Sequence, residues 1–163
     1  MGQRSKNTVR AAIIAALYVV LTHMQNLLLP GSASWAIQFR ISEALCVLAM
    51  FTPAAISGLS IGCFLFNLTF AAALPLDMVV GTLATFLAAI AMWKLRRIPV
   101  VPLLMPALFN ALLVGWELSV YIGGGFLFNA ITVAIGEAAV LLTLGALLNI
   151  TLKKHRIFSK NTP

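Results

Sequence analysis

Long apolar segments separated by short polar breaks run along nearly the whole chain. The first covers residues 9–29 and ends at Pro30-Gly31-Ser32, a combination that stops helices. A block over 41–73 is interrupted at Thr52-Pro53, and further segments cover 77–93, 100–118 and 126–152. A helix needs about 20 apolar residues to cross a bilayer. The pattern therefore predicts an all-α integral membrane protein, with residues 1–163 forming a single transmembrane domain.

The basic residues decide whether the 41–73 block holds one helix or two. They form three clusters, Arg4 to Arg10, Lys94 to Arg97 and Lys153 to Lys160, at the ends of apolar segments. Lys and Arg near span ends favour the cytoplasmic side. All three clusters lie on the cytoplasmic side only if the 41–73 block crosses the membrane twice, which gives six crossings in all. We therefore expect six transmembrane helices, at about 9–29, 41–51, 54–71, 77–93, 100–118 and 126–152, with both termini cytoplasmic.

The second of these helices is expected to be short and tilted. Residues 41–51 reach only about 16 Å at 1.5 Å per residue, against a hydrocarbon core of about 30 Å. The first helix follows a basic start and resembles a signal sequence. Its apolar run is longer than the roughly 7–15 residues of a signal peptide, so we expect it to stay uncleaved.

Composition narrows the function classes. Hydrophobic residues make up 61% of the chain, charged residues 9%, and the mean hydropathy is +1.02. Soluble domains carry roughly 25% charged residues, so the bilayer is the expected environment and a nucleic-acid groove is not expected. Cys46 and Cys63 lie in apolar runs without metal-ligand spacing and behave as small hydrophobes. With no phosphate loop and no nucleophile elbow, we expect no enzyme, cofactor or metal.

Ionisable residues inside membrane segments are costly and mark functional sites. All four acids, Glu43, Asp77, Glu117 and Glu137, fall within or beside apolar segments, in the outer half or near the midplane of the predicted topology. Asp77 is expected to cap the helix that follows it. The candidate ligand-binding residues are Arg40, Glu43, Asn67, Asn110, Trp116, Glu117 and Glu137.

Several of these candidates have simpler interpretations. Arg40 and Glu43, three residues apart, either neutralise each other or hold a ligand together. Asn110, Glu117 and Tyr121 share one helix face and suggest a polar wall. Trp116 either joins that wall or belongs to the aromatic belt at the membrane interface.

Small residues mark two close-packing faces. Gly58 and Gly62 form a GxxxG pattern that predicts close packing within the chain. The first helix carries two overlapping small-xxx-small pairs. They either pack within the chain or dock another protein. These candidate partner-contact residues are Ala11, Ala12, Ala15 and Ala16.

Three motifs point to a known family: "IQFRISEAL" at 37–45, "GTLAT" at 81–85 and "IGE" at 135–137. Together with the alanine-rich first helix they resemble the QueT family of substrate-binding S components of energy-coupling factor (ECF) transporters. The resemblance implies capture of a queuosine-related 7-deazaguanine base outside the cell, in the bacterial plasma membrane. It also implies partnership with a transmembrane T component and two cytoplasmic ATPases, the alanine face contacting the T component.

Two other functions remain open. A stand-alone secondary transporter would use the buried carboxylates as proton relays, and inverted repeats would favour it, but no convincing three-plus-three repeat is visible. A membrane assembly subunit would bind no ligand. Ligand retention by the purified chain without a gradient favours the S component. Accumulation in vesicles without ATPase partners favours the secondary transporter.

Overall fold

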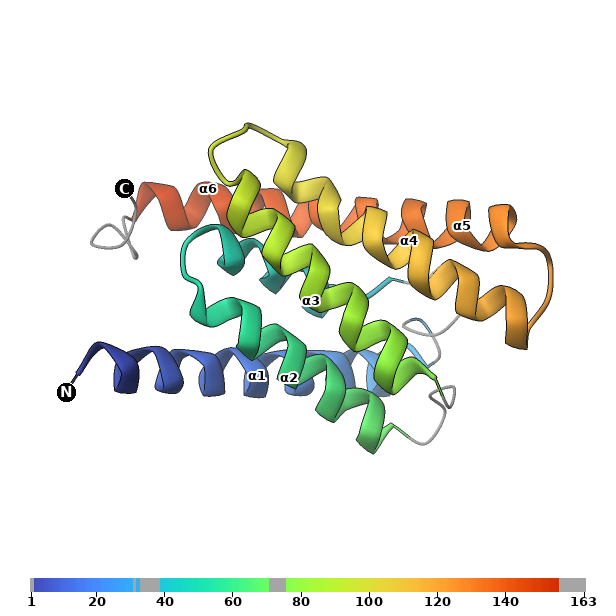
Figure 1. Cartoon of the computed structure of the whole chain (residues 1–163), viewed down its shortest axis with the longest axis horizontal. Helices are drawn as coiled ribbons and strands as arrows, with labels where there is room; N and C mark the ends of the chain where they lie inside the picture. Colours follow the sequence, from blue (N-terminus) through green and yellow to red (C-terminus); the bar gives the residue numbers. More distant parts are fainter. Residues whose placement is uncertain (1, 31, 33–38, 71–75, 156–163) are drawn as a thin grey trace.

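The computed structural model describes residues 2–30, 32, 39–70 and 76–155, and within them the chain forms helices and turns without any strand. Four stretches are long and apolar enough to cross a membrane: α1 (Gln3–Leu28), α3 (Asp77–Leu95), α4 (Val101–Tyr121) and a last stretch over Phe126–Lys154. The two shorter helices are η1 (Ile41–Met50) and α2 (Ala54–Thr69). Figure 1 shows these elements as an elongated bundle.

The boundaries differ from the predicted ones mainly where polar residues extend a helix. α1 begins at Gln3 rather than near Val9 and so includes the first basic cluster, because Lys, Arg and Gln are good helix formers. The break in the 41–73 block falls at Thr52–Pro53, with α2 starting at Ala54. Position 71, the predicted end of that helix, lies outside the described residues.

The last apolar stretch is not a uniform α-helix. It consists of α5 (Phe126–Val140), a π-helical turn η2 (Leu141–Gly145) and α6 (Ala146–Lys154). The periodicity of the sequence predicted one regular helix here. A single π turn adds only one residue to a long apolar stretch, too small a change for the pattern of this stretch to reveal.

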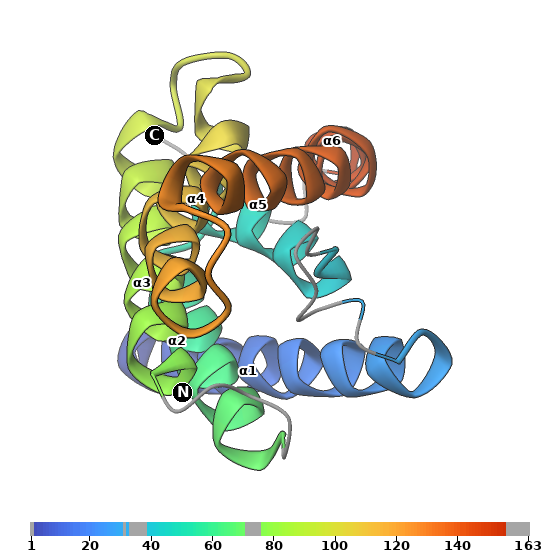
Figure 2. The same ribbon diagram turned by 90° about the vertical axis from the view of Figure 1, so that its right-hand side faces the viewer.

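The short helix η1 is a 3₁₀-helix and lies at the centre of the bundle. At about 2.0 Å rise per residue its ten residues span about 20 Å, more than the α-helical estimate but less than a bilayer core. It contacts every other helical element of the described chain. Figure 2 shows it between α1 and the α5–α6 stretch. Its residues are therefore positioned by the whole fold.

Glycines bring pairs of helices into close contact. A Cβ atom added to Gly58 would lie 2.7 Å from the Ala11 carbonyl oxygen, and one added to Gly62 would lie 2.7 Å from Tyr18 Cβ. The GxxxG face of α2 thus packs against α1. Gly115 of α4 similarly faces the backbone of Ala130 in α5, with a Cβ contact of 2.8 Å.

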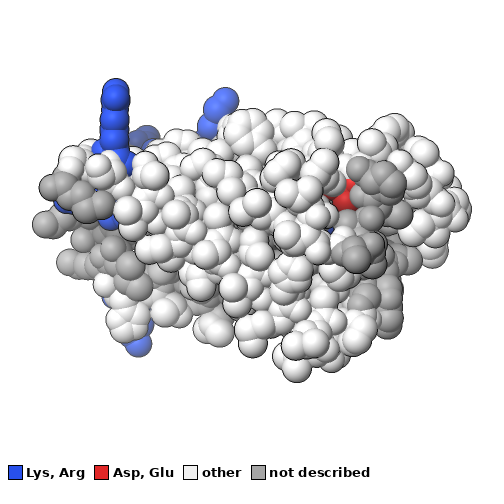
Figure 3. Space-filling view, turned by 90° about the horizontal axis from the view of Figure 1, so that it is seen from below, with Lys and Arg blue, Asp and Glu red and all other residues white. Residues whose placement is uncertain are grey.

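Charges separate along the long axis of the molecule. The start of α1 and the end of α6 lie at the same end of the bundle (Figure 1), and both carry basic residues. On the face shown in Figure 3, most of the visible Lys and Arg atoms lie toward this end, and the visible acidic atoms lie in the opposite half.

Substituting Gly62 with alanine tests the α1–α2 contact. The added methyl group would overlap Tyr18 Cβ and the Ala15 carbonyl oxygen, 3.0 Å away. Overpacking of this kind typically costs about 1–3 kcal/mol. We expect Gly62→Ala to lower the thermal unfolding temperature in detergent by several degrees. Gly2→Ala, where nothing lies within 4 Å of the added atom, is the matched control. Equal unfolding temperatures for the two variants would contradict the close approach.

Candidate ligand-binding site

A stripe of polar residues on α1 holds the start of η1. Tyr18 and Thr22 are one helical turn apart, and both are fully buried. The Tyr18 hydroxyl donates a hydrogen bond of 2.6 Å to Glu43 Oε1, and the hydroxyls of Thr22 and Ser42 lie 2.7 Å apart. Neighbouring residues of η1 are thus tied to successive turns of α1.

Gln25 continues this stripe and secures the segment that leads into η1. Its Oε1 accepts a hydrogen bond from the Ile41 N–H at 2.7 Å. Its Nε2 donates to the Phe39 carbonyl oxygen, and to the Ser32 hydroxyl at 2.9 Å. Because Gln25 is buried, these bonds are shielded from competing solvent and fix the backbone around Arg40.

The carboxylate of Glu43 is fully buried and engaged on both oxygens. Oε2 accepts a hydrogen bond of 3.0 Å from Cys46 Sγ, while Oε1 accepts the bond from Tyr18. Glu43 therefore has donors within the fold, and its place at the centre does not depend on a ligand.

Arg40 lies close to several charged and polar groups rather than to Glu43 alone. Its side chain is 2% exposed, and its charge interacts with Tyr18, Cys63, Asp77 and Glu43. Arg40 therefore does not form an isolated pair with Glu43, which was one of the alternatives considered from the sequence.

Asn67 links α2 to α3 beside this arginine. Its Nδ2 donates a hydrogen bond of 2.7 Å to the Asp77 carbonyl oxygen. A Cβ atom at Gly81 would lie 3.1 Å from Asn67 Nδ2 and 3.8 Å from Arg40 Nη1. Because Gly81 has no side chain, Asn67 and Arg40 can pack close to the backbone of α3.

Asp77 differs from the capping role expected for it. The N-cap position of α3 is Leu76, and no side-chain capping bond forms there. Asp77 is the first helical residue, is 5% exposed, and its charge acts on Arg40 and Glu117. Its buried side chain therefore belongs to the acidic group in the interior rather than to a helix cap.

Three buried polar side chains on α4 and α5 lack internal partners. Asn110, Glu117 and Glu137 are at most 1% exposed. Both amide atoms of Asn110 and all four carboxylate oxygens have no hydrogen-bond partner among the described residues. Buried polar groups nearly always have partners, and an unpaired buried charge is costly. These three side chains are therefore the candidates for contact with a bound molecule.

The acids form two pairs that share Arg40. Glu117 interacts with Asp77 and Arg40, whereas Glu137 interacts with Glu43 and Arg40. In each pair one carboxylate belongs to a helix start, at Glu43 or Asp77, and the other to the interior of α4 or α5. The predicted residues Arg40, Glu43, Asn67, Glu117 and Glu137 are therefore brought together.

Two aromatic candidates lie elsewhere. Trp116 is 49% exposed and Tyr121 is 44% exposed, so neither joins the buried group. Their positions favour the alternative of an aromatic belt at the interface. Asn129 of α5 donates a hydrogen bond of 2.7 Å to the Gly123 carbonyl oxygen and secures the turn before α5.

The four alanines of α1 divide between two roles. Ala15 is 5% exposed and packs against α2 near Gly62, and Ala11 is half-buried against Gly58. Ala12 and Ala16 are exposed. Ala11 and Ala15 thus belong to a face that packs within the chain. Ala12 and Ala16 belong to an exposed face, to which the alternative of docking another protein applies.

Sequence reasoning left Tyr18, Cys46 and Asp77 out of the site. The available signal was the spacing of Tyr18, Thr22 and Gln25, which share one face of an otherwise apolar helix. Among the described residues, no group of three His, Cys, Asp or Glu side chains is placed to hold a metal ion.

Four apolar helical stretches long enough to cross a bilayer place the chain in the class of multi-pass membrane proteins. This chain belongs to the QueT transporter family, whose model matches residues 8–154. The family resemblance found in the sequence is thereby confirmed.

One curated relative is similar to part of the chain. It is the queuosine precursor transporter QueT of Lactococcus lactis subsp. cremoris, 39% identical over 83 residues. The similarity covers 50% of this chain and 46% of the relative, so the chain spans about half the length of the relative that it matches. No solved structure matches the chain significantly.

Removing the Tyr18 hydroxyl tests the contact between α1 and η1. Tyr18→Phe keeps the buried ring but takes one donor from the Glu43 carboxylate. Losing a hydrogen bond to a charged group costs about 1.5–3 kcal/mol. We expect a lower thermal unfolding temperature than for Tyr121→Phe, which removes the hydroxyl of an exposed tyrosine. Similar unfolding temperatures for both variants would show that the Tyr18–Glu43 bond contributes little.

Proposed function

We propose that the chain is the substrate-binding S component of an ECF importer and captures a queuosine precursor on the extracellular side. The observation that carries this proposal is the set of unpartnered buried groups on Asn110, Glu117 and Glu137. The family and the function of the relative supply the class of ligand.

The distribution of charge supports a topology of six crossings with both termini in the cytoplasm. The basic clusters lie at the start of α1, the end of α3 and the end of α6. The positive-inside rule assigns these ends to the cytoplasm. The acidic site then lies in the outer half of the membrane. At about 20 Å, η1 would cross as a tilted or incomplete span.

The chemistry of the site suits a heterocycle rich in N–H donors. A guanine-type edge presents N–H groups beside a carbonyl oxygen. A carboxylate such as Glu117 can accept two parallel N–H bonds, and the amide of Asn110 offers both a donor and an acceptor. Such a ligand would supply the partners that these side chains lack within the described residues.

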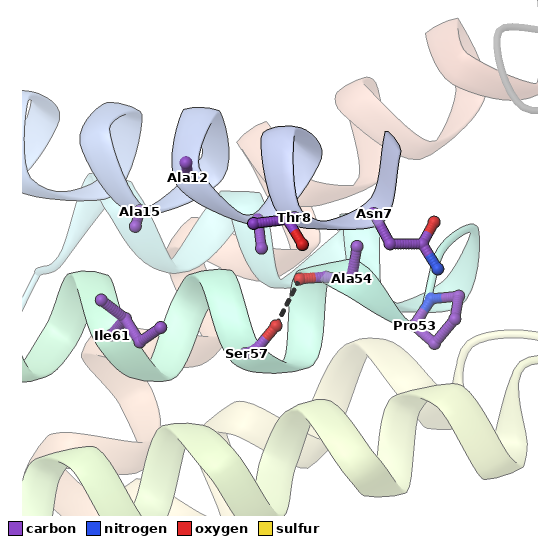
Figure 4. A pocket seen from close by; sticks show the side chains of 9 residues that line it. Asn7, Thr8, Ala12, Ala15, Pro53, Ala54, Ser57 and Ile61 are labelled. Atoms are coloured by element: carbon purple, nitrogen blue, oxygen red, sulfur yellow. Dashed lines mark hydrogen bonds between the residues drawn. The ribbon is translucent and has the colours of Figure 1, made fainter. Parts of the chain in front are cut away.

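The exposed alanines of α1 provide a face for the T component. Ala12 and Ala16 allow the backbone of another helix to approach closely. Beside Ala12, α1 and α2 enclose a hollow of about 520 Å³ near the basic end of the bundle. Figure 4 shows Ala12 and Ala15 above Ser57 and Ile61 of α2 along this hollow. Two ATPases bound to the T component would then supply the energy for import.

Ligand binding by the purified chain is the first test. We expect a queuosine precursor to bind without any ion gradient, and Glu117→Gln to weaken that binding by about 1.5–3 kcal/mol, the range for a hydrogen bond to a charged group. Isothermal titration in detergent or nanodiscs measures both. Ser119→Ala, whose hydroxyl bonds only the Trp116 carbonyl oxygen in the described structure, is the control on the same helix.

Unchanged affinity in Glu117→Gln would remove this carboxylate from the site.

Transport assays in proteoliposomes distinguish an ATP-driven importer from a secondary transporter. Accumulation of the precursor by the chain alone, driven by a proton gradient, would overturn the S-component assignment in favour of a secondary transporter.

Bulky substitutions on the alanine face test partner contact. We expect Ala12→Leu or Ala16→Leu to leave precursor affinity intact and to abolish ATP-driven uptake with the partner subunits, since a larger side chain prevents close helix approach. Ala139→Leu, on an exposed face of α5, is the matched control. Uptake at the control's rate would exclude this face from the interface, and loss of precursor binding would indicate a packing role instead.

A further inference from the structure

We infer that Glu137 receives a positively charged amine of the ligand, so that the site selects a heterocycle bearing a protonated amine over a neutral analogue of similar shape. This inference rests on the proposed function and adds to it the charge of the substrate.

The charge balance of the chain is the first argument. All four acids belong to the buried group, and each is at most 5% exposed. Arg40 is the only Lys or Arg in the sequence outside the three basic clusters at the ends of apolar segments. Segments 31–38 and 71–76 contain no Lys, Arg or His. One guanidinium therefore faces four carboxyl groups, and the described residues supply no second Lys or Arg to this group.

The remaining basic side chain of this half does not compensate them. His23 of α1 forms a 3.0 Å hydrogen bond with the Thr69 hydroxyl, and its ring packs edge-on against Phe66. These contacts are made with α2, whereas the carboxyl groups belong to η1, α3, α4 and α5.

Within the acidic group, Glu137, like Glu117, receives no hydrogen bond from the described residues. Glu43, its acidic neighbour, already receives hydrogen bonds from Tyr18 and Cys46. Glu137 is 1% exposed, and both its oxygens lack partners among the described residues. A buried carboxylate beside another carboxylate gains most from a ligand that brings both a charge and N–H donors.

Depth separates Glu137 from Glu117. Glu117 lies four residues before the end of α4, about 6 Å along the helix axis, whereas Glu137 lies eleven residues after the start of α5, about 16 Å along it. A ligand that meets both must extend inward from the outer end. Its heterocyclic edge would face Glu117, and a substituent on the opposite side of the ring would reach Glu137.

The local backbone also marks Glu137. The π turn η2 begins at Leu141, whose N–H bonds to the Glu137 and Ala138 carbonyl oxygens. Single π turns inside α-helices occur frequently at functional sites. Here the π turn begins at Leu141, four residues after Glu137.

Two probes that differ in one substituent test the inference: 7-aminomethyl-7-deazaguanine, which is a cation at neutral pH, and 7-cyano-7-deazaguanine, which is neutral. We expect the wild-type chain in nanodiscs to bind the amine roughly ten- to a hundredfold more tightly, the range for one charge-assisted hydrogen bond. Glu137→Gln should weaken binding of the amine by that factor and leave the affinity for the nitrile unchanged.

Two further variants serve as controls. Glu117→Gln should weaken both probes alike, and Glu137→Asp should retain a preference for the amine. Binding of the nitrile to each variant shows that the protein is folded.

Equal affinity of the wild-type chain for both probes would overturn the inference while leaving the proposed function standing. An equal loss of both probes in Glu137→Gln would also overturn it, since the side chain would then support the site without meeting the amine. Failure of both probes to bind the wild-type chain would overturn the proposed function and this inference together.

Discussion

The hydrogen bonds between α1 and η1 are the constraint on which the rest of the structure depends. Tyr18, Thr22 and Gln25 satisfy the polar groups that open η1, in surroundings where water offers no substitute. Because η1 touches every other helical element of the described chain, these bonds also set the positions of the helices around it. A short 3₁₀-helix is weak by itself, and here its ends and side chains are held from outside.

This arrangement explains how a membrane interior tolerates so many acids. Glu43 is stabilised by donors from the fold, while Arg40 acts on both acidic pairs at once. Glu117 and Glu137 are left without partners among the described residues. Carboxylates of the same chemical kind therefore differ in their surroundings: Glu43 holds η1 against α1, whereas Glu117 and Glu137 receive no hydrogen bond from the described residues.

Local features of the sequence were sufficient for much of the fold. Apolar length and the basic clusters predicted the helical segments, and Gly58 and Gly62 indicated a close helix contact because small residues act through their immediate surroundings. The site was harder to predict. Trp116 and Glu117 are adjacent in sequence, yet one is half-exposed and the other buried. Asp77 is buried at the start of α3, although its position in the sequence suggested a helix cap. Neither the 3₁₀ nor the π geometry leaves a periodicity that sequence alone reveals.

The π turn over Leu141–Gly145 has a consequence for chain length. A π turn accommodates one residue more than the α turn that it replaces. Deleting a single residue there would let the stretch close into regular α-helix, with the parts on either side keeping their orientation. The same deletion between Asn110 and Glu117 would rotate one relative to the other by about 100°. Homologous chains that are one residue shorter in this stretch are thus compatible with the same bundle.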